Sequence, residues 1–443
     1  MNDARQKINN KKYLGMTTYQ IFLTLVAFFG WTLVSMDLNM FSTTLPDIMS
    51  TFHIPTSYSG LITSAVFGGM AVLQFIMSPL IEYLGRKLMF NITLLGTALF
   101  TGLTIFASNI GALIGVRIVA DGFSYSEFPA GLTIIQEGVP GNMRGSAYGF
   151  VQSGYPVGFF LASVATAIIV PIYGWRFVYL VGIIPAIVVI IARLWVKEPE
   201  RYKEYKKIKE LEEEGKKEEA LDENQKTPYK VNAEKTVHFT YSQLFAPDLR
   251  RRNFIFTTAE FLHEFTTPTF LFFTAVILEV YKGLSATQAL TILAVGTAIA
   301  AFGYFFAGLI GNHIKHGRKW TAAASSILGG ILAVFFIYAH GYVDLFLTYI
   351  LFEPILLTWN GTWWSYVSES NPTRVRGTAG GYINSVSTVA WIVSSALWTV
   401  GLLTVGLMNW WIIGGVVPAV LAGLVALTGR TINPKLQLEQ ISI

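Results

Sequence analysis

Eight ionisable side chains stand inside long apolar segments of this sequence, where a charge is energetically costly. They are Asp37, Arg117, Asp121, Glu127, Glu260, His263, Glu264 and Glu353. A charged side chain at the centre of a bilayer costs about 2.5–3.5 kcal/mol even on a lenient insertion scale, and such residues are typical of ion and substrate pathways. Along the chain they fall on the first, fourth, seventh and tenth apolar segments. We therefore expect these four segments to line one polar cavity, shielded by the other segments.

The first candidate for proton chemistry is Asp37. It should lie at a depth similar to that of Arg117, and Asp121 shares a helix face with Arg117 at i, i+4. A neighbouring guanidinium favours the charged carboxylate, whereas burial favours the neutral acid. A site balanced between these effects can take up a proton on one side of a membrane and release it on the other. Asp37 is our first choice for proton coupling, with Arg117, Asp121 and Glu127 nearby. Arg117 could also change partner to a substrate carboxylate, and a permanent structural ion pair is the alternative.

A second candidate lies on the seventh apolar segment. Glu260, His263 and Glu264 share one helix face at i, i+3 and i+4, and Pro268 beyond them predicts a broken or kinked helix. Because histidine exchanges its proton near physiological pH, this cluster is the alternative proton site, with His263 and Glu264 as its coupling residues. The competing interpretation is that this stretch is hydrated and has no role.

Polar and aromatic residues of several segments could contact a substrate. The candidates are Arg117, Gln152, Tyr155, Glu260, His263, Glu353, Trp359, Asn360, Asn384 and Trp391. Tryptophan is also common at the membrane–water interface, and we expect Trp363 and Trp364 to be interfacial anchors. The chain has no Cys and six scattered His, so neither a metal site nor a cofactor is expected. No nucleophile set or phosphate-binding loop is present, which argues against an enzyme and against ATP coupling.

Composition predicts an all-α integral membrane protein. Of the 443 residues, 53% are hydrophobic and 13% are charged, which is about half the charged fraction of soluble domains. A helix needs roughly 20 apolar residues to cross a bilayer. Twelve segments meet this requirement: 18–45, 58–80, 88–108, 111–136, 146–170, 175–196, 254–281, 286–311, 321–341, 343–367, 378–404 and 409–429.

Basic residues predict the orientation of these segments. A cytoplasmic N-terminus leaves only Arg176 and Lys282 in the outer loops and places the other loop Lys and Arg residues inside, which is the positive-inside pattern. Both termini are then cytoplasmic, and the expected location is the plasma membrane. The net charge of +5 reflects this topology and contact with anionic lipid rather than nucleic acid. The first apolar run is too long for a cleavable signal peptide.

The chain contains an internal duplication. The tripeptide GRK at 85–87 recurs at 317–319, an offset of 232 residues. The pattern E-x-x-P-x-x-x-R-G-x-x-x-G begins at Glu137 and again at Glu369, at the same offset. We therefore expect twelve transmembrane helices in two six-helix pseudo-repeats around a central cavity.

The duplication also predicts the domain boundaries. Residues 1–196 form the first bundle and residues 253–443 the second, joined by a cytoplasmic linker at 197–252. The start of the linker is rich in Lys and Glu at helical spacing, which predicts a solvated surface helix. A partner-binding or regulatory element is the alternative.

The loop after the second segment resembles a signature of the major facilitator superfamily. Residues 78–87 read SPLIEYLGRK, similar to G-x-L-x-D-x-x-G-R-[KR] with Ser78 for Gly and Glu82 for Asp. The second copy keeps GRK but has Asn312 and His313 near the acidic position. The resemblance implies a cytoplasmic gate of charged residues, although the basic residues also serve as topology determinants. Its expected members are Glu82, Gly85, Arg86, Lys87, Glu137, Arg144, Gly317, Arg318, Lys319, Glu369 and Arg376.

Two further segments resemble the metabolite and organic-acid proton symporters of this superfamily. Residues 117–129 read RIVADGFSYSEFP, similar to R-x-L-x-G-x-G-x-G-G-E-x-P, with Asp121 and Tyr125 in place of glycines. Residues 149–158 read GFVQSGYPVG, similar to the G-x-x-Q-x-G-Y-x-x-G of lactate and sialate type symporters.

These patterns favour a proton-coupled symporter of a small polar metabolite, most readily an organic acid, working as a monomer by alternating access. The excess of buried acids over a single buried Arg argues against an anionic substrate. A sugar or polyol symporter, an antiporter of cationic compounds and a non-transporting membrane sensor therefore remain alternatives.

Overall fold

The computed structural model describes residues 12–13, 15–198, 200–226, 242–314, 316–371 and 375–432. Within these ranges the chain is helical apart from a two-stranded antiparallel hairpin, β1 (Lys12–Tyr13) and β2 (Met16–Thr17). The helices of the first half are α2 (Thr18–Thr51), α3 (Ser59–Leu84), α4 (Arg86–Leu103), α5 (Ile110–Gly138), α6 (Gly141–Gln152), α7 (Gly154–Tyr173) and α8 (Ile183–Arg193). Those of the second half are α12 (Arg250–Phe265), α13 (Thr274–Val276), α14 (Ala286–His313), α15 (Gly317–Tyr338), α16 (Gly341–Ser370), α17 (Arg376–Thr404), α18 (Gly406–Trp410) and α19 (Val417–Leu427).

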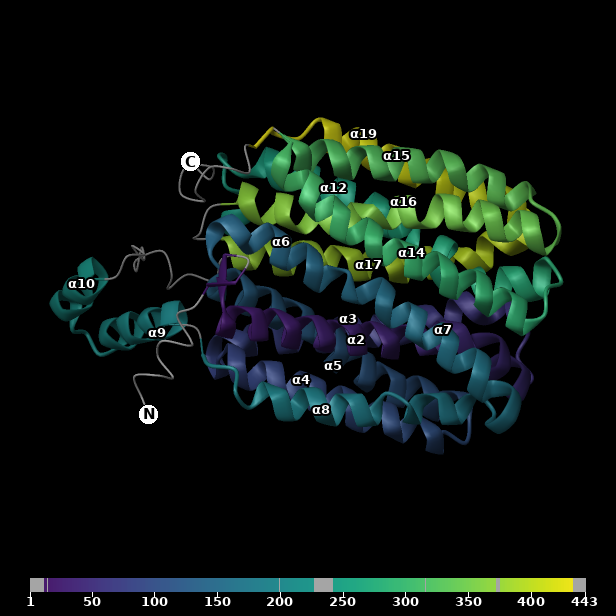
Figure 1. Cartoon of the computed structure of the whole chain (residues 1–443), viewed down its shortest axis with the longest axis horizontal. Helices are drawn as coiled ribbons and strands as arrows, with labels where there is room; N and C mark the ends of the chain where they lie inside the picture. The colour runs from purple at the N-terminus through teal and green to yellow at the C-terminus, as the bar shows by residue number, and fades with distance from the viewer. Residues whose placement is uncertain are drawn as a thin grey trace.

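Short 3₁₀ and π segments join or interrupt these helices. The 3₁₀ segments are Thr56–Tyr58, Thr104–Phe106, Trp175–Leu180 and Ser242–Phe245, and the π segments are Pro268–Phe272, Ile277–Tyr281 and Trp411–Val416. Between the halves, α9 (Glu200–Glu213) and α10 (Lys217–Lys226) form a charged helical pair, as the composition of the linker predicts. The end of the molecule at which α9 and α10 lie is called the linker end below, and the opposite end is called the far end (Figure 1).

Local sequence signals explain where several helices begin. The Thr17 hydroxyl accepts the backbone N–H of Gln20 and the Gln20 side chain accepts that of Thr17, a capping box that starts α2. Ser285 and Gln288 repeat this arrangement at the start of α14. These contacts satisfy backbone donors that a helix N-terminus leaves unpaired, so each helix begins at a defined residue.

The helices pack as two bundles that lie side by side with roughly parallel axes (Figure 1). In the first bundle α2 packs on α5 and α7, and α5 packs on α3 and α4. In the second, α16 packs between α14 and α15, and α12 packs on α17 and α19. The bundles meet where α3 contacts α17 and where α14 contacts α6 and α7.

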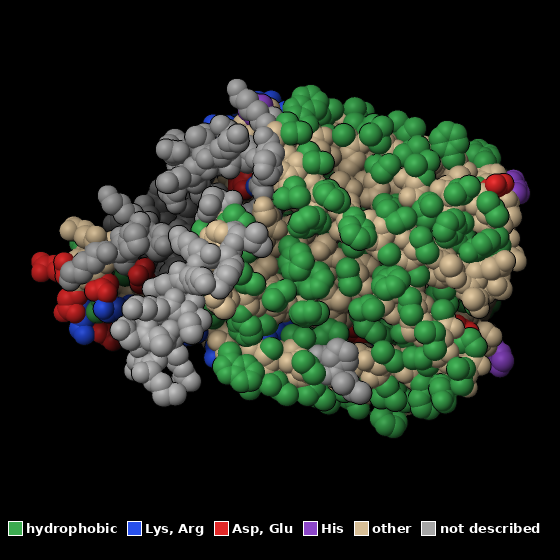
Figure 2. Space-filling model, in the orientation of Figure 1, with side chains coloured by type: hydrophobic (Ala, Val, Ile, Leu, Met, Phe, Trp, Pro, Cys, Tyr) green, Lys and Arg blue, Asp and Glu red, His purple; other side chains and the backbone are tan. Residues whose placement is uncertain are grey.

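The outer surface matches a membrane environment. Apolar side chains cover the sides of the bundles, whereas charged side chains gather at the linker end (Figure 2). Over the described residues, nine helices are long and apolar enough to cross a membrane, and the bent pair Arg250–Phe272 and Thr274–Tyr281 makes a tenth. The other two predicted segments are α5, which carries four Asp, Glu or Arg residues, and 175–196, which Gly182 divides into a 3₁₀ segment and α8. All twelve predicted segments thus coincide with helical spans.

The seventh span is irregular at Pro268 and bent just beyond it. Helix α12 ends at Phe265, a π segment runs over Pro268–Phe272, and the parts Arg250–Phe272 and Thr274–Tyr281 are bent by 42°. The stretch 266–273 is called the break below. Proline cannot donate a backbone hydrogen bond and crowds the preceding turn, which accounts for the end of α12 before Pro268. Thr267 and Leu271 of the break line the space between the bundles.

Candidate functional site

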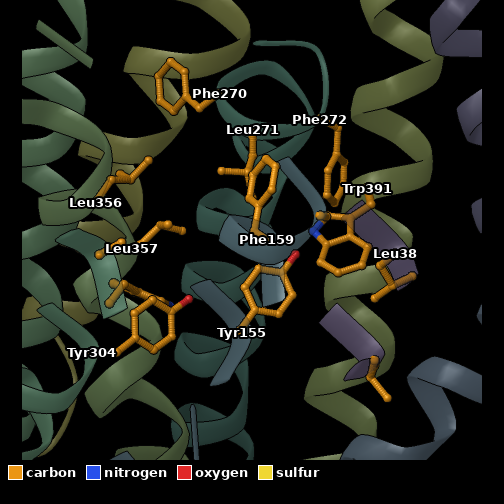
Figure 3. Close-up of a cluster of buried hydrophobic side chains, with 14 of the residues drawn as sticks. Leu38, Tyr155, Phe159, Phe270, Leu271, Phe272, Tyr304, Leu356, Leu357 and Trp391 are labelled. Carbon is orange, nitrogen blue, oxygen red and sulfur yellow. The ribbon is translucent and has the colours of Figure 1, made fainter. Parts of the chain in front are cut away.

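The space between the bundles contains a central cavity of about 40 Å³. Its lining is mostly aromatic and apolar, with three amides and one carboxyl group among the described residues. The lining residues are Trp31, Tyr125, Gln152, Tyr155, Glu264, Thr267, Leu271, Tyr304, Leu357, Asn360, Trp364, Asn384 and Trp391. Figure 3 shows Tyr155 between Tyr304 and Trp391, with Leu271 on one side of the group. A cavity of this size holds a few water molecules, so a substrate requires the bundles to move apart.

Glu264 is the acidic group of the central cavity. Its carboxylate accepts hydrogen bonds from Trp391 Nε1 and Thr267 Oγ1, both at 2.8 Å, and from Asn360 Nδ2 at 3.4 Å. These donors come from α17, from the break in the seventh span and from α16, so three elements fix the orientation of one carboxyl group. Of the eight ionisable residues singled out in the sequence, only Glu264 lines this cavity.

Glu260 and His263 lie behind the cavity wall, inside the second bundle. Glu260 accepts a hydrogen bond from Ser387 Oγ at 2.7 Å and from Trp359 Nε1 at 3.4 Å. The His263 ring stacks on Trp359 with centroids 4.4 Å apart, and its Nδ1 lies 3.0 Å from Ser326 Oγ. Trp359 therefore connects both residues without contacting the cavity.

Glu353 is an isolated buried acid. It is fully buried in α16, and neither of its carboxylate oxygens has a hydrogen-bond partner among the described residues. The Tyr349 hydroxyl, one helical turn away, also lacks a partner. A Cβ on Gly296 of α14 would lie 3.4 Å from Glu353 Oε2, so the glycine allows α14 to pack directly over this carboxyl group.

Asp37 and Arg117 lie at the same depth, as expected, but they face the interior of the first bundle. Arg117 Nη1 lies 2.9 Å from Asp37 Oδ1, and the same guanidinium contacts Asp121. Thr101 and Ser124 donate further hydrogen bonds to Asp37, at 2.7 and 3.1 Å. Arg117 is thus shared by two carboxylates and is fully buried. The expectation that all eight ionisable residues share one cavity is wrong, because helix rotation directs this group inward.

A second buried ion pair joins Glu127 to Arg193. Arg193 is not among the candidate residues that the sequence predicts. Arg193 reaches from α8 to Glu127 on α5 and also donates to the Phe90 carbonyl, while its guanidinium lies 3.5 Å from the centre of the Phe90 ring. A Cβ on Gly30 would collide with both Arg193 and Glu127. The glycine in α2 therefore makes room for the pair. In the sequence, Arg193 lies close to Lys197 at the end of an apolar run. A basic residue at such a position is easily interpreted as one that only sets the membrane orientation.

Two tryptophans expected at the membrane interface are instead internal. Trp363 is fully buried, stacks on Trp359 with centroids 4.2 Å apart and packs edge-on against Phe256. Trp364 is buried in the wall of the central cavity. The expectation of interfacial anchors is wrong for both, because α16 turns this face toward the bundle interior.

The gate residues form contacts within each half in the part of the chain that is described. Arg318 makes a two-pronged contact with Glu369, with N–O distances of 2.8 and 2.7 Å. Lys319 donates to the carbonyls of Leu427 and Gly429. Lys87 donates through its backbone to Glu198 and through Nζ to the Leu194 carbonyl. Gly85 has a φ of 97°, and Gly317 approaches the backbone of Gly311 closely. The side chains of Glu82, Arg86, Glu137, Arg144 and Arg376 lie outside the described set.

Direct contacts close the far end of the cavity. Ser42 Oγ donates to the Phe272 carbonyl at 2.6 Å, which joins α2 to the break in the seventh span. The rings of Phe67, Phe272 and Trp391 pack together between the two bundles, with centroids 5.2 to 5.5 Å apart. At the linker end, α6 and α14 meet where a Cβ on Gly149 would lie 3.3 Å from Gly308 Cα. The cavity is therefore narrowed toward both the far end and the linker end.

Comparison with known proteins agrees with this architecture. The model of the Major Facilitator Superfamily matches residues 27–395. The chain belongs to this superfamily. It is 26% identical over 405 residues to a cis,cis-muconate transport protein of Acinetobacter baylyi, covering 90% of this chain and 91% of that one. It is 24% identical to a niacin transporter of the same organism, covering 82% and 83%.

A solved structure shows the same fold. The proton:xylose symporter XylE, bound to 6-bromo-6-deoxy-D-glucose, superposes with a TM-score of 0.69 at 17% identity, covering 93% of this chain and 94% of that one. The expected architecture of twelve helices in two six-helix repeats is thereby confirmed. The protein is a multi-span membrane transporter, and the family and its relatives confirm that it is not an enzyme.

Proposed function

We propose that this transporter is a proton-coupled symporter of small organic acids. One observation carries the proposal: the central cavity combines aromatic walls with a single carboxyl group, Glu264, and with no Lys or Arg among its described lining residues. The relatives that transport muconate and niacin, both carboxylates, supply the substrate class. Tyr125 and Trp391, with centroids 5.0 Å apart, offer flat surfaces for an unsaturated or aromatic acid.

The chemistry of Glu264 links substrate and proton. Two ionised carboxylates cannot lie in contact in a buried site, but two carboxyl groups can share one proton. A substrate carboxylate therefore binds beside Glu264 only when one proton enters with it. The N–H groups of Trp391 and Asn360, which hydrogen-bond Glu264, are placed to hold the acid or to donate to the substrate.

The geometry favours the second of the two proton sites expected from the sequence. Asp37 is held by Arg117, Thr101 and Ser124 outside the central cavity, which fits a structural ion pair. Glu264 faces the cavity and contacts no cation among the described residues. Alternating access would widen the cavity at one end while contacts such as Ser42 to Phe272 hold the other. We further propose that the linker end faces the cytoplasm, in keeping with its basic loops, and that the membrane is the plasma membrane.

The test is substrate exchange in proteoliposomes. Vesicles loaded with unlabelled niacin or cis,cis-muconate should take up the labelled compound. A pH gradient that is acidic outside the vesicles should drive accumulation of the compound against its concentration gradient. The Glu264→Gln variant should retain exchange of the neutral analogue nicotinamide and lose gradient-driven accumulation of the acids. Undiminished accumulation of acids by Glu264→Gln would show that the coupling proton is elsewhere.

A cation antiporter is the second candidate. The same observation favours it, since a lone buried carboxyl group among aromatic rings also suits an organic cation. Outward proton movement on adding a protonated amine to the same proteoliposomes would decide for this function.

A further inference from the structure

The buried acids of the two bundles have different contact partners. In the first bundle every fully buried acid of the described residues contacts a buried arginine. Asp37 and Asp121 contact Arg117, and Glu127 contacts Arg193. These contacts favour the charged forms and tie α2, α5 and α8 together. Protonation of Glu127 would leave Arg193 uncompensated, so Glu127 is a poor proton carrier. Arg117 is shared by Asp37 and Asp121, so it keeps one partner if the other carboxylate takes up a proton.

In the second bundle no fully buried acid contacts a Lys or Arg among the described residues. Glu264 accepts hydrogen bonds from neutral groups of three elements, and Glu260 accepts them from Ser387 and Trp359. Glu353 has no partner for either oxygen. An ionised carboxylate without a cation or hydrogen-bond donors is strongly disfavoured inside a protein. These surroundings therefore favour the neutral, protonated form of Glu353 over the charged form.

The three acids follow one another along the bundle axis. Counting 1.5 Å per residue, Glu260 lies about 15 Å and Glu264 about 21 Å from the start of α12 at the linker end. By the same measure Glu353 lies about 26 Å from the linker end of α16, and thus nearer the far end than Glu264 and at the depth of the cavity residue Thr267. Leu357, one turn nearer the linker end than Glu353, lines the cavity.

Tyrosine hydroxyls occupy the space between the acids. Tyr155 and Tyr304, which line the cavity, each interact electrostatically with both Glu264 and Glu353. The titratable groups that face the three acids are neutral phenols and one imidazole. Near Glu353 they are Tyr349, Tyr155 and Tyr304, and near Glu264 they are Tyr125, Tyr155 and Tyr304. Near Glu260 they are Tyr125 and Tyr148, and His263 stacks on the Trp359 ring that hydrogen-bonds Glu260.

We propose that a proton route runs through the second bundle, from Glu353 through Glu264 to Glu260. Glu353 takes up the proton from the far side, Glu264 holds it beside the substrate, and Glu260 releases it toward the linker end. Each transfer breaks one O–H bond and forms another, directly or through a tyrosine hydroxyl or water. Glu127, which is paired one to one with Arg193, belongs to a fixed framework that does not exchange protons during transport. The direction and the role of Glu264 rest on the function proposed above.

Two measurements test this route, and the first does not depend on the substrate. Infrared spectra of the purified protein at neutral pH should show the C=O stretch of a protonated carboxyl group. This band should lose intensity in Glu353→Gln and keep it in Glu127→Gln, the matched control from the first bundle. An unchanged band in Glu353→Gln shows that Glu353 is not a protonated acid and overturns the proposal.

The second measurement uses proteoliposomes with niacin and cis,cis-muconate. Glu353→Gln and Glu260→Gln should each lose pH-gradient-driven accumulation, so that the internal concentration falls to the external one, while exchange of labelled for unlabelled substrate continues. Normal accumulation in either variant overturns the route. If the unmodified protein exchanges neither compound, the proposed function fails for these substrates, and the infrared result still decides whether Glu353 is a protonated acid.

Discussion

The Glu127–Arg193 pair offers a quantitative test of how the first bundle is held together. Both side chains are buried, and Arg193 has only Glu127 and the carbonyl and ring of Phe90 as described partners. Removing one member of a buried ion pair typically costs about 3–5 kcal/mol, because the other charge is left uncompensated. We therefore expect Glu127→Leu to lower the free energy of unfolding by about 3–5 kcal/mol. The double variant Glu127→Leu/Arg193→Met should recover most of this loss, since apolar groups of similar volume can replace a buried pair.

The assay is a double-mutant cycle on the purified protein in detergent, with unfolding followed by denaturant titration. Glu223→Gln is the matched control, because Glu223 pairs with Lys207 at 2.6 Å on the exposed linker helices. A surface pair of that kind contributes about 0–1 kcal/mol. The reasoning is refuted if Glu127→Leu is as mild as the control, or if the double variant is less stable than Glu127→Leu alone.

Three further predictions follow from single contacts. Gly30→Ala should destabilise the protein nearly as much as Glu127→Leu, because the added methyl group displaces the ion pair; a melting temperature equal to that of the unmodified protein would contradict the packing at this glycine. Trp391→Phe keeps the aromatic surface but removes the 2.8 Å hydrogen bond to Glu264, so substrate affinity should fall by about tenfold, equivalent to about 1.4 kcal/mol, as measured by exchange at varied concentration. Arg318→Gln removes the two-pronged contact with Glu369 and should lower stability by about 1–3 kcal/mol by thermal unfolding, whereas no change would mean that solvent screens this pair.

The helices and their repeat could be predicted from the sequence because a membrane span needs only length and apolar composition. The broken seventh span was also predictable, since Pro268 acts through local covalent geometry. Boundaries were less certain where polar residues extend a helix beyond the apolar run, as in α2, which continues to Thr51. Segment 175–196 is divided rather than continuous, because Gly182 stands between its two helical parts.

Which acids face the interior of a bundle and which face the central cavity could not be predicted in the same way. Spacing places Asp37, Arg117 and Asp121 at one depth, but it does not give the rotation of α2 and α5 that turns them into the first bundle. The pairing of Glu127 depends on Arg193, 66 residues further along the chain, whose direction is set by how α8 packs. In the first bundle each buried acid contacts a buried arginine, so a search of the apolar segments for such partners would have found Arg193.

The most direct test of the central claim is proton movement into proteoliposomes that contain a pH-sensitive dye. The account predicts that adding niacin or cis,cis-muconate outside acidifies the vesicle interior, and that the Glu264→Gln variant shows no acidification. Acidification of equal size in Glu264→Gln, or movement of the acids with no proton movement at all, would contradict the claim that the cavity carboxyl group couples protons to organic acids.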